Sequence, residues 1–149
     1  MSVADLKYID AQELYKWIQE GHTTLLHEPF QVIDVRGSDY VGGHIVGGWH
    51  RPYKQLAHHP ELLNQLLEDL RKLASSSSSE QRIINVVFHC TQSQRRGPAA
   101  ALKLLRVMNK KDREHIHVWI LRGGFNHWQD QYGEDSTVTE DYQPDLWCW

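Results

Sequence analysis

Three short apolar runs stand out along the chain, and each has the length of a single strand. They are FQVIDVR (residues 30–36), RIINVVFH (82–89) and HVWILRGG (117–124). The second run is the richest in β-branched residues, which favour strands. Continuous apolar runs of this length are typical of strands that are buried on both faces, as in a parallel sheet. The pattern therefore predicts three buried strands.

Segments with helical periodicity alternate with these runs. Asp10 is placed to cap the first such segment, Glu13 to complete a capping box, and Gly21 to end it. Pro98 falls in the first turn of a later one, where proline is well tolerated. The predicted helices cover residues 10–20, 60–74, 98–108 and 125–133. This alternation predicts an α/β fold with a parallel sheet and helices on both of its faces.

Length and composition set limits on what the chain does. Its 149 residues, of which 40% are hydrophobic and 23% charged, suit one domain spanning residues 1–149. A net charge of −3 favours neither nucleic acid nor membrane as a partner. Two cysteines cannot form a disulfide framework, and we see no signal-peptide-like or membrane-spanning segment. We expect a cytoplasmic protein, with the nucleus as a second compartment.

The segment FHCTQSQRRGPAA (residues 88–100) carries the most distinctive chemistry. Cys90 follows a predicted strand and precedes a predicted helix, which is where open α/β sheets bind ligands. A loop of this length can turn its backbone N–H groups inward and form an anion cradle. Arg96 would close the cradle with a planar guanidinium. The residues between Cys90 and Arg96 are Thr91, Gln92, Ser93, Gln94 and Arg95.

A cationic loop at a helix N-terminus favours a thiolate at Cys90 near neutral pH. Such a thiolate is suited to attack phosphorus, arsenic or a sulfane sulfur. Ser93 is a candidate donor to the sulfur, and His89 a candidate support that bonds the loop backbone or a carboxylate. A buried core role is the alternative for Cys90, but its spacing from Arg96 favours catalysis. No Cys-x-x-Cys pair accompanies it, so we predict no metal site.

The segment HCTQSQRRGPAA resembles the active-site loop of the M-phase inducer phosphatases, whose pattern is His-Cys-X5-Arg-Gly-Pro. Residues 32–50 (VIDVRGSDYVGGHIVGGWH) resemble the N-terminal signature of the rhodanese fold, and residues 119–129 (WILRGGFNHWQ) its C-terminal signature. The resemblance implies a rhodanese-like fold, with a central parallel five-stranded sheet flanked by helices. Small fungal rhodanese-like phosphatases and fungal arsenate reductases are similar proteins of this group.

The resemblance also implies roles for single residues. Cys90 and Arg96 would be catalytic, and the loop between them would bind the oxyanion. Asp34 and Arg36 would support the site by pairing with each other or with nearby backbone, while His44 would pin the glycine-rich loop. Arg122, Gly123 and Gly124 would shape a turn beside the pocket.

This chain departs from the phosphatase pattern at three positions. Thr91 and Arg95 stand where those phosphatases carry glutamates, so the loop has no carboxylate to protonate a leaving group. Asp39 or Glu28 would have to supply one from elsewhere. Arg95 either recruits substrate or is a solvated cation. Val35 stands where those phosphatases carry a second cysteine that traps the oxidised nucleophile.

The sequence thus predicts a cysteine-dependent phosphatase that forms a cysteinyl-phosphate. The alternative is an arsenate reductase that uses glutathione, with glutaredoxin, as co-substrate. Sulfurtransferases of this fold have a loop shorter by one residue, which disfavours that activity, and a non-catalytic phosphate-binding module is a further alternative. We expect no cofactor. The substrate would be a phosphorylated protein, or a small phosphate or arsenate compound, and the chain a monomer or weak homodimer. Tryptophans in the C-terminal LWCW should dock on the core or a partner.

Overall fold

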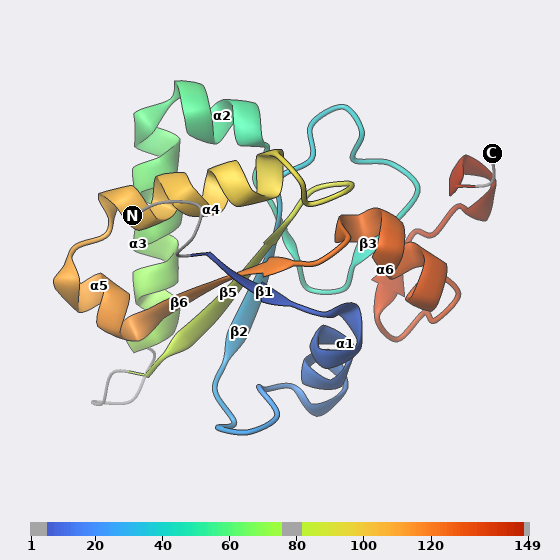
Figure 1. Ribbon diagram of the computed structural model, residues 1–149, viewed down its shortest axis with the longest axis horizontal. Coiled ribbons are helices and arrows are strands. Elements are labelled where there is room, and N and C mark those ends of the chain that lie inside the picture. Colours follow the sequence, from blue (N-terminus) through green and yellow to red (C-terminus); the bar gives the residue numbers. More distant parts are fainter. Residues whose placement is uncertain (1–5, 76–81, 148–149) are drawn as a thin grey trace.

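The computed structural model describes residues 6–75 and 82–147, and its centre is a five-stranded parallel sheet (Figure 1). The strand order is β1-β6-β5-β2-β4, and each neighbouring pair is parallel. A separate antiparallel pair joins β3 to β7. The strands are β1 (Lys7–Ile9), β2 (Phe30–Asp34), β3 (His44–Ile45), β4 (Trp49–His50), β5 (Ile84–His89), β6 (Ile116–Leu121) and β7 (Thr139–Glu140). The predicted parallel sheet is confirmed.

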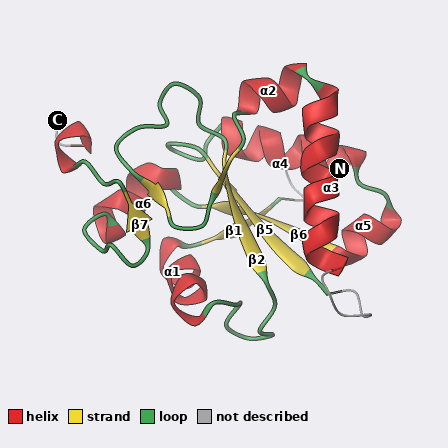
Figure 2. Cartoon of the chain, turned by 180° about the vertical axis from the view of Figure 1, so that it is seen from behind, coloured by secondary structure: helices red, strands yellow, loops and turns green. Residues whose placement is uncertain are grey.

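Helices cover both faces of the sheet, as predicted. They are α1 (Ala11–Glu20), α2 (Tyr53–His58), α3 (Pro60–Ser75), α4 (Arg96–Val107), α5 (Lys110–His115), α6 (Gly124–Tyr132) and the 3₁₀ helix η2 (Pro144–Trp147). Val32 and Val87 pack with α1 and α6 on one face. Ile33 and Phe88 pack with α2, α3 and α4 on the other. Figure 2 shows the same arrangement from behind, with α1 and α6 on the opposite side of the strands from α3.

The differences from the predicted elements have local causes. The elements β1, β3, β4, β7, α2 and α5 were not predicted, because each is too short to show a period. The strand predicted through Arg36 ends at Asp34, where the Arg36 side chain turns back onto the Asp34 carboxylate. The helix predicted from Pro98 begins at Arg96, which keeps the proline in its first turn.

The predicted capping box of α1 is wrong. The Asp10 side chain makes no cap and instead accepts a hydrogen bond from Arg122 Nε at 3.1 Å. The Glu13 carboxylate accepts from Trp17 Nε1 and from the Thr24 hydroxyl. Gly21 does end the helix, as predicted, with a φ of +84°.

The C-terminal segment docks on the sheet's carboxyl edge. Trp147 Nε1 donates to the Gly42 carbonyl at 3.0 Å, and its ring lies 5.4 Å from that of Phe125. The predicted docking of a C-terminal tryptophan is therefore confirmed for Trp147, whereas Trp149 lies outside the described residues. Across the ranges that the structure describes, no helix combines the length and the apolar character needed to cross a membrane.

Candidate active site

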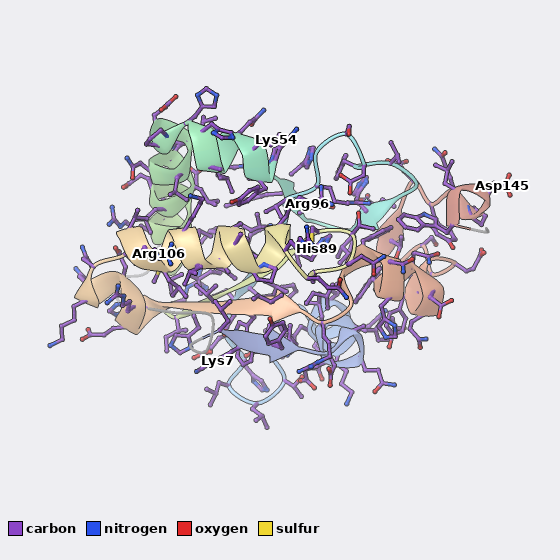
Figure 3. All side chains as sticks on the ribbon, turned by 45° about the horizontal axis from the view of Figure 1, so that its top comes forward. Lys7, Lys54, His89, Arg96, Arg106 and Asp145 are labelled. Atoms are coloured by element: carbon purple, nitrogen blue, oxygen red, sulfur yellow. The ribbon has the colours of Figure 1, made fainter. Side chains whose placement is uncertain are left out.

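The site is built where β2 and β5 end side by side. Asp34, the last residue of β2, is in register with His89, the last residue of β5. The segments that follow these strands therefore meet at the carboxyl edge of the sheet, which is where such sheets bind ligands. Figure 3 shows His89 and Arg96 at this edge, beside the N-terminal end of α4.

The loop after β5 brings a backbone N–H group onto the buried Cys90 sulfur. Cys90 is only 3% exposed, and the Ser93 N–H donates to its Sγ at 3.2 Å. Ser93 reaches this position with a φ of +56°, a conformation that costs energy for a non-glycine residue. Within the described ranges, five further N–H groups of the loop find no intramolecular acceptor: those of Thr91, Gln92, Gln94, Arg95 and Arg96. These donors leave the loop able to bind an anion.

The carbonyl side of the same loop is held by α6. Phe125 N–H donates to the Cys90 carbonyl and Asn126 N–H to the Thr91 carbonyl, both at 2.9 Å. Gly124 allows this close approach, because a Cβ at that position would lie 2.4 Å from the Thr91 oxygen. The first turn of α6 therefore fixes the outer side of the loop and leaves its other face for a ligand.

A buried ion pair lies under the loop. Arg36 is fully buried, and its Nη2 lies 2.7 Å from Asp34 Oδ2, while its Nε contacts both carboxylate oxygens at 3.0 Å. Arg36 Nη2 also donates to the Gly43 carbonyl at 2.9 Å. Burial alone would raise the pKa of Asp34, but the hydrogen bonds and the charge of Arg36 help to lower it. The predicted pairing of Asp34 with Arg36 is confirmed.

His89 connects this ion pair to the cysteine loop. Its Nδ1 lies 3.1 Å from the Cys90 carbonyl, and its Nε2 lies 3.7 Å from Asp34 Oδ2. Complete burial lowers the pKa of His89, so the ring is neutral and Nδ1–H donates to the carbonyl. The predicted hydrogen bond from His89 to the loop backbone is confirmed. In the described part of the chain, His89 Nε2 and Ser93 Oγ are buried without a hydrogen bond.

A second ion pair lies at the mouth of the loop. Arg96 donates from Nη1 to Asp39 Oδ1 at 2.7 Å and from Nη2 to Asp39 Oδ2 at 2.5 Å. The Thr91 hydroxyl donates to the same carboxylate, and so does the Gly37 N–H at 3.1 Å. Hydrogen bonds from Arg96 and then Thr91 hold the pKa of Asp39 far below its usual range. Asp39, chiefly, and to a lesser degree the neighbouring Cys90 raise the pKa of Arg96.

A carboxylate therefore stands beside the loop although the loop itself has none. Of the two candidates named from the sequence, Asp39 reaches the site. Glu28 lies at the opposite end of the sheet, where it accepts from Asn85 Nδ2 at 3.0 Å. The pairing of Asp39 with Arg96 could not be predicted from the sequence. It depends on β2 and β5 being neighbouring strands, and only the strand order of the folded sheet shows this.

The remaining predicted residues lie around this core. His44 pins the glycine-rich segment through Glu140 of β7, at 3.3 Å between His44 Nε2 and Glu140 Oε1. Arg122 pairs with Asp10, at 3.1 Å between Nε and Oδ1. Gln94 and Arg95 are exposed, and within the described ranges Arg95 makes no ion pair or hydrogen bond through its side chain.

Three further features complete the surroundings. Gln92 borders a cavity of about 710 Å³ that is also lined by His127 and Trp147. Val35 is fully buried in the core, so no second thiol lies at that position. Over residues 6–75 and 82–147, no group of three or more His, Cys, Asp or Glu side chains could hold a metal ion.

Comparison with known proteins defines the class to which this fold and site belong. The family model described as rhodanese-like domain matches residues 10–131. The chain therefore belongs to the rhodanese-like family.

Individual relatives place it more narrowly. CDC25-like phosphatase YCH1 of Saccharomyces cerevisiae is 50% identical over 146 residues, which cover 98% of this chain and 97% of that protein. Arsenical-resistance protein 2 of the same yeast is 35% identical over 108 residues, or 72% of this chain and 79% of that protein. The solved structure of Ygr203w, a yeast protein tyrosine phosphatase of the rhodanese family, is 50% identical, with a TM-score of 0.92 over 99% of this chain and 100% of that one.

The resemblance drawn from the three sequence segments is confirmed. Human M-phase inducer phosphatase 3 is 32% identical over 139 residues, which cover 87% of this chain but 26% of that longer protein. The rhodanese-like fold predicted from the sequence is confirmed by the family match and by the solved structure.

Proposed function

We propose that this protein is a cysteine-dependent phosphatase that hydrolyses phosphoric monoesters on the loop from Cys90 to Arg96. One observation carries the proposal: the Ser93 N–H donates to the Cys90 sulfur, the neighbouring loop N–H groups have no acceptor within the described ranges, and the Arg96 guanidinium lies beside the thiol. A tetrahedral oxyanion satisfies these donors and this charge together. The phosphatase names of relatives that match nearly the whole chain support the same activity.

The proposed reaction has two displacements at phosphorus. The Cys90 thiolate attacks in line, the S–P bond forms, and the ester P–O bond breaks with its electron pair leaving on oxygen. Arg96 and the loop amides stabilise the charge on the equatorial oxygens, where most catalysis of phosphoryl transfer arises. Water then attacks the cysteinyl-phosphate, releasing phosphate and restoring the thiolate. We expect this sequence of steps to require no metal.

The direct test is turnover of an aryl phosphate by wild type and by Cys90→Ser. We expect the wild type to release phosphate and the serine variant to lose activity by roughly 10³-fold or more, because an alcohol is a far weaker nucleophile than a thiolate. Acid quenching during turnover should trap phosphate on Cys90. Equal rates in the two proteins would remove the proposal.

Arsenate reduction is a second candidate function, favoured by the match to arsenical-resistance protein 2. Arg95 is consistent with it, because this exposed cation adds positive charge beside the loop. Cys90 would attack arsenate, and glutathione with glutaredoxin would supply the electrons that reduce the adduct to arsenite. Glutathione-coupled turnover with arsenate, measured beside phosphatase and sulfurtransferase assays on the same preparation, distinguishes the activities. Absence of such turnover at saturating arsenate would exclude it.

A further inference from the structure

Asp39 occupies the part of Arg96 that an oxyanion needs. Its two carboxylate oxygens accept from the two terminal nitrogens of the guanidinium, at 2.7 and 2.5 Å. This is the paired geometry with which a guanidinium grips two oxygens of a phosphate. The Cys90 thiol lies beside the same guanidinium. An oxyanion seated over the sulfur and Asp39 would therefore compete for one set of donors.

The groups around Asp39 hold it in this place without closing the site. Thr91, the residue next to Cys90, donates its hydroxyl to the carboxylate, and Gly37 donates its N–H. Thr91 stands where the related phosphatases have a glutamate, so a carboxylate reaches this corner from another segment of the chain. The side chains of Asp39 and Arg96 remain 39% and 35% exposed. A displaced carboxylate can therefore move into water at little cost.

We propose that Asp39 is a positioning residue that holds the oxyanion's place on Arg96 in the empty site and is displaced when the oxyanion binds. This inference rests on the proposed function, because it requires the loop to bind a tetrahedral anion. Asp39 keeps the guanidinium oriented in the empty site and lowers the affinity for the incoming anion. The pair thus sets substrate and product affinity through competition, in addition to any role of Arg96 in the transition state.

Displacement has a consequence for protons. In the empty site Asp39 stays ionised to unusually low pH, because Arg96 and Thr91 stabilise its charge. Arg96 is the charged group in contact with it, and Cys90 is the titratable group next to Arg96. Once an oxyanion takes the guanidinium, the carboxyl group loses this stabilisation and faces a negative ligand. Its pKa should return to about 4 or above, so anion binding takes up a proton near pH 4–5.

The first test compares tungstate affinity at neutral pH in wild type, Asp39→Asn and Glu28→Gln by calorimetry. The asparagine side chain fills the same space without charge, so we expect about three- to tenfold tighter binding than in wild type. Glu28→Gln removes one negative charge at the far end of the sheet and should match wild type. Unchanged or weaker binding by Asp39→Asn, while wild type binds and turns over aryl phosphate, would overturn the inference. No tungstate binding by wild type would instead overturn the proposed function.

The second test measures proton uptake when sulfate binds near pH 4, where a carboxyl group of ordinary pKa is about half protonated and sulfate itself does not titrate. Binding enthalpies in buffers of different ionisation enthalpy report the uptake. The experiment uses Cys90→Ser, which removes the titration of the thiol, with and without Asp39→Asn. We expect uptake while Asp39 is present and none once it is replaced by asparagine. Equal uptake in both proteins, or none in either, would contradict displacement of Asp39.

Discussion

Two aspartate–arginine pairs of the same chemistry lie near the cysteine loop and differ in their surroundings. Asp34 and Arg36 are 4% and 0% exposed, and Arg36 makes further bonds to backbone carbonyls. Asp39 and Arg96 are 39% and 35% exposed, and their other contacts belong to the loop and its approach. A buried pair cannot be separated without leaving a charge out of water, whereas an exposed pair exchanges partners readily. From their burial we infer that the Asp34–Arg36 pair stabilises the fold and that the Asp39–Arg96 pair opens for ligand binding.

The largest effects on stability and on activity should come from replacing the arginine of each pair by methionine. Arg36→Met leaves the Asp34 carboxylate buried without its cation, and we expect it to lower the free energy of unfolding by about 3–5 kcal/mol. Arg96→Met should lower it by less than about 1 kcal/mol. Its effect should instead fall on kcat/KM for an aryl phosphate, with a loss of roughly 10²–10³-fold.

Urea unfolding and steady-state kinetics on both variants check this contrast. The comparison fails if Arg36→Met is as stable as wild type. It fails equally if Arg96→Met unfolds as easily as Arg36→Met.

A smaller effect is expected at the turn that holds the loop in place. Gly124→Ala adds a Cβ that would approach the Thr91 carbonyl to 2.4 Å, so the loop or α6 must shift. A shift of this size beside the nucleophile should lower kcat/KM by about 10²-fold. Gly37→Ala is the matched control, since a Cβ there meets nothing within 4 Å and the N–H to Asp39 remains. Kinetics that are equal in the two variants would show that the α6 turn does not set the loop.

A smaller difference between the two pairs is expected in how the free energy of unfolding depends on pH. Burial lowers the pKa of His89, which lies beside the Asp34 pair, so below about pH 6.5 the unfolded chain holds a proton that the folded one lacks. Stability then falls as the pH drops, by at most about 1.4 kcal/mol per pH unit for this one group. Urea unfolding between about pH 7 and pH 5 measures the slope. His89→Asn should flatten it and Asp39→Asn should not, and the opposite ranking would refute the assignment.

The smallest change is expected at Thr91. Thr91→Val removes one hydroxyl donor from Asp39 and keeps the Arg96 bonds, so Asp39 should leave more easily. We expect tungstate to bind about two- to threefold more tightly, the equivalent of about half a kcal/mol from one exposed hydrogen bond. Calorimetry beside Thr91→Ser, which keeps the hydroxyl, measures the difference. Weaker binding by the valine variant would show that Thr91 serves the anion directly.

The central strands and the Cys90 loop could be predicted from the sequence, but the contacts between Asp39 and Arg96 could not. Apolar runs predicted the central strands, because both faces of β2, β5 and β6 are covered and their side chains must be apolar. The spacing of Cys90 and Arg96 predicted the loop, since the backbone that binds the anion and the arginine that pairs with it lie within one short segment of the chain. The pairing of Asp39 with Arg96 joins segments 57 residues apart and depends on sheet order, which no local pattern encodes. The short strands at the sheet edges were not predicted, because they contain too few residues to show a hydrophobic pattern.

The most direct test of the two-pair account is a crystal structure of the protein with tungstate bound over Cys90. We predict that the oxyanion takes both terminal nitrogens of Arg96 and that the Asp39 carboxylate has left them, while the bonds between Asp34 and Arg36 are unchanged. An anion bound in the loop with the Asp39–Arg96 bonds intact would contradict the account.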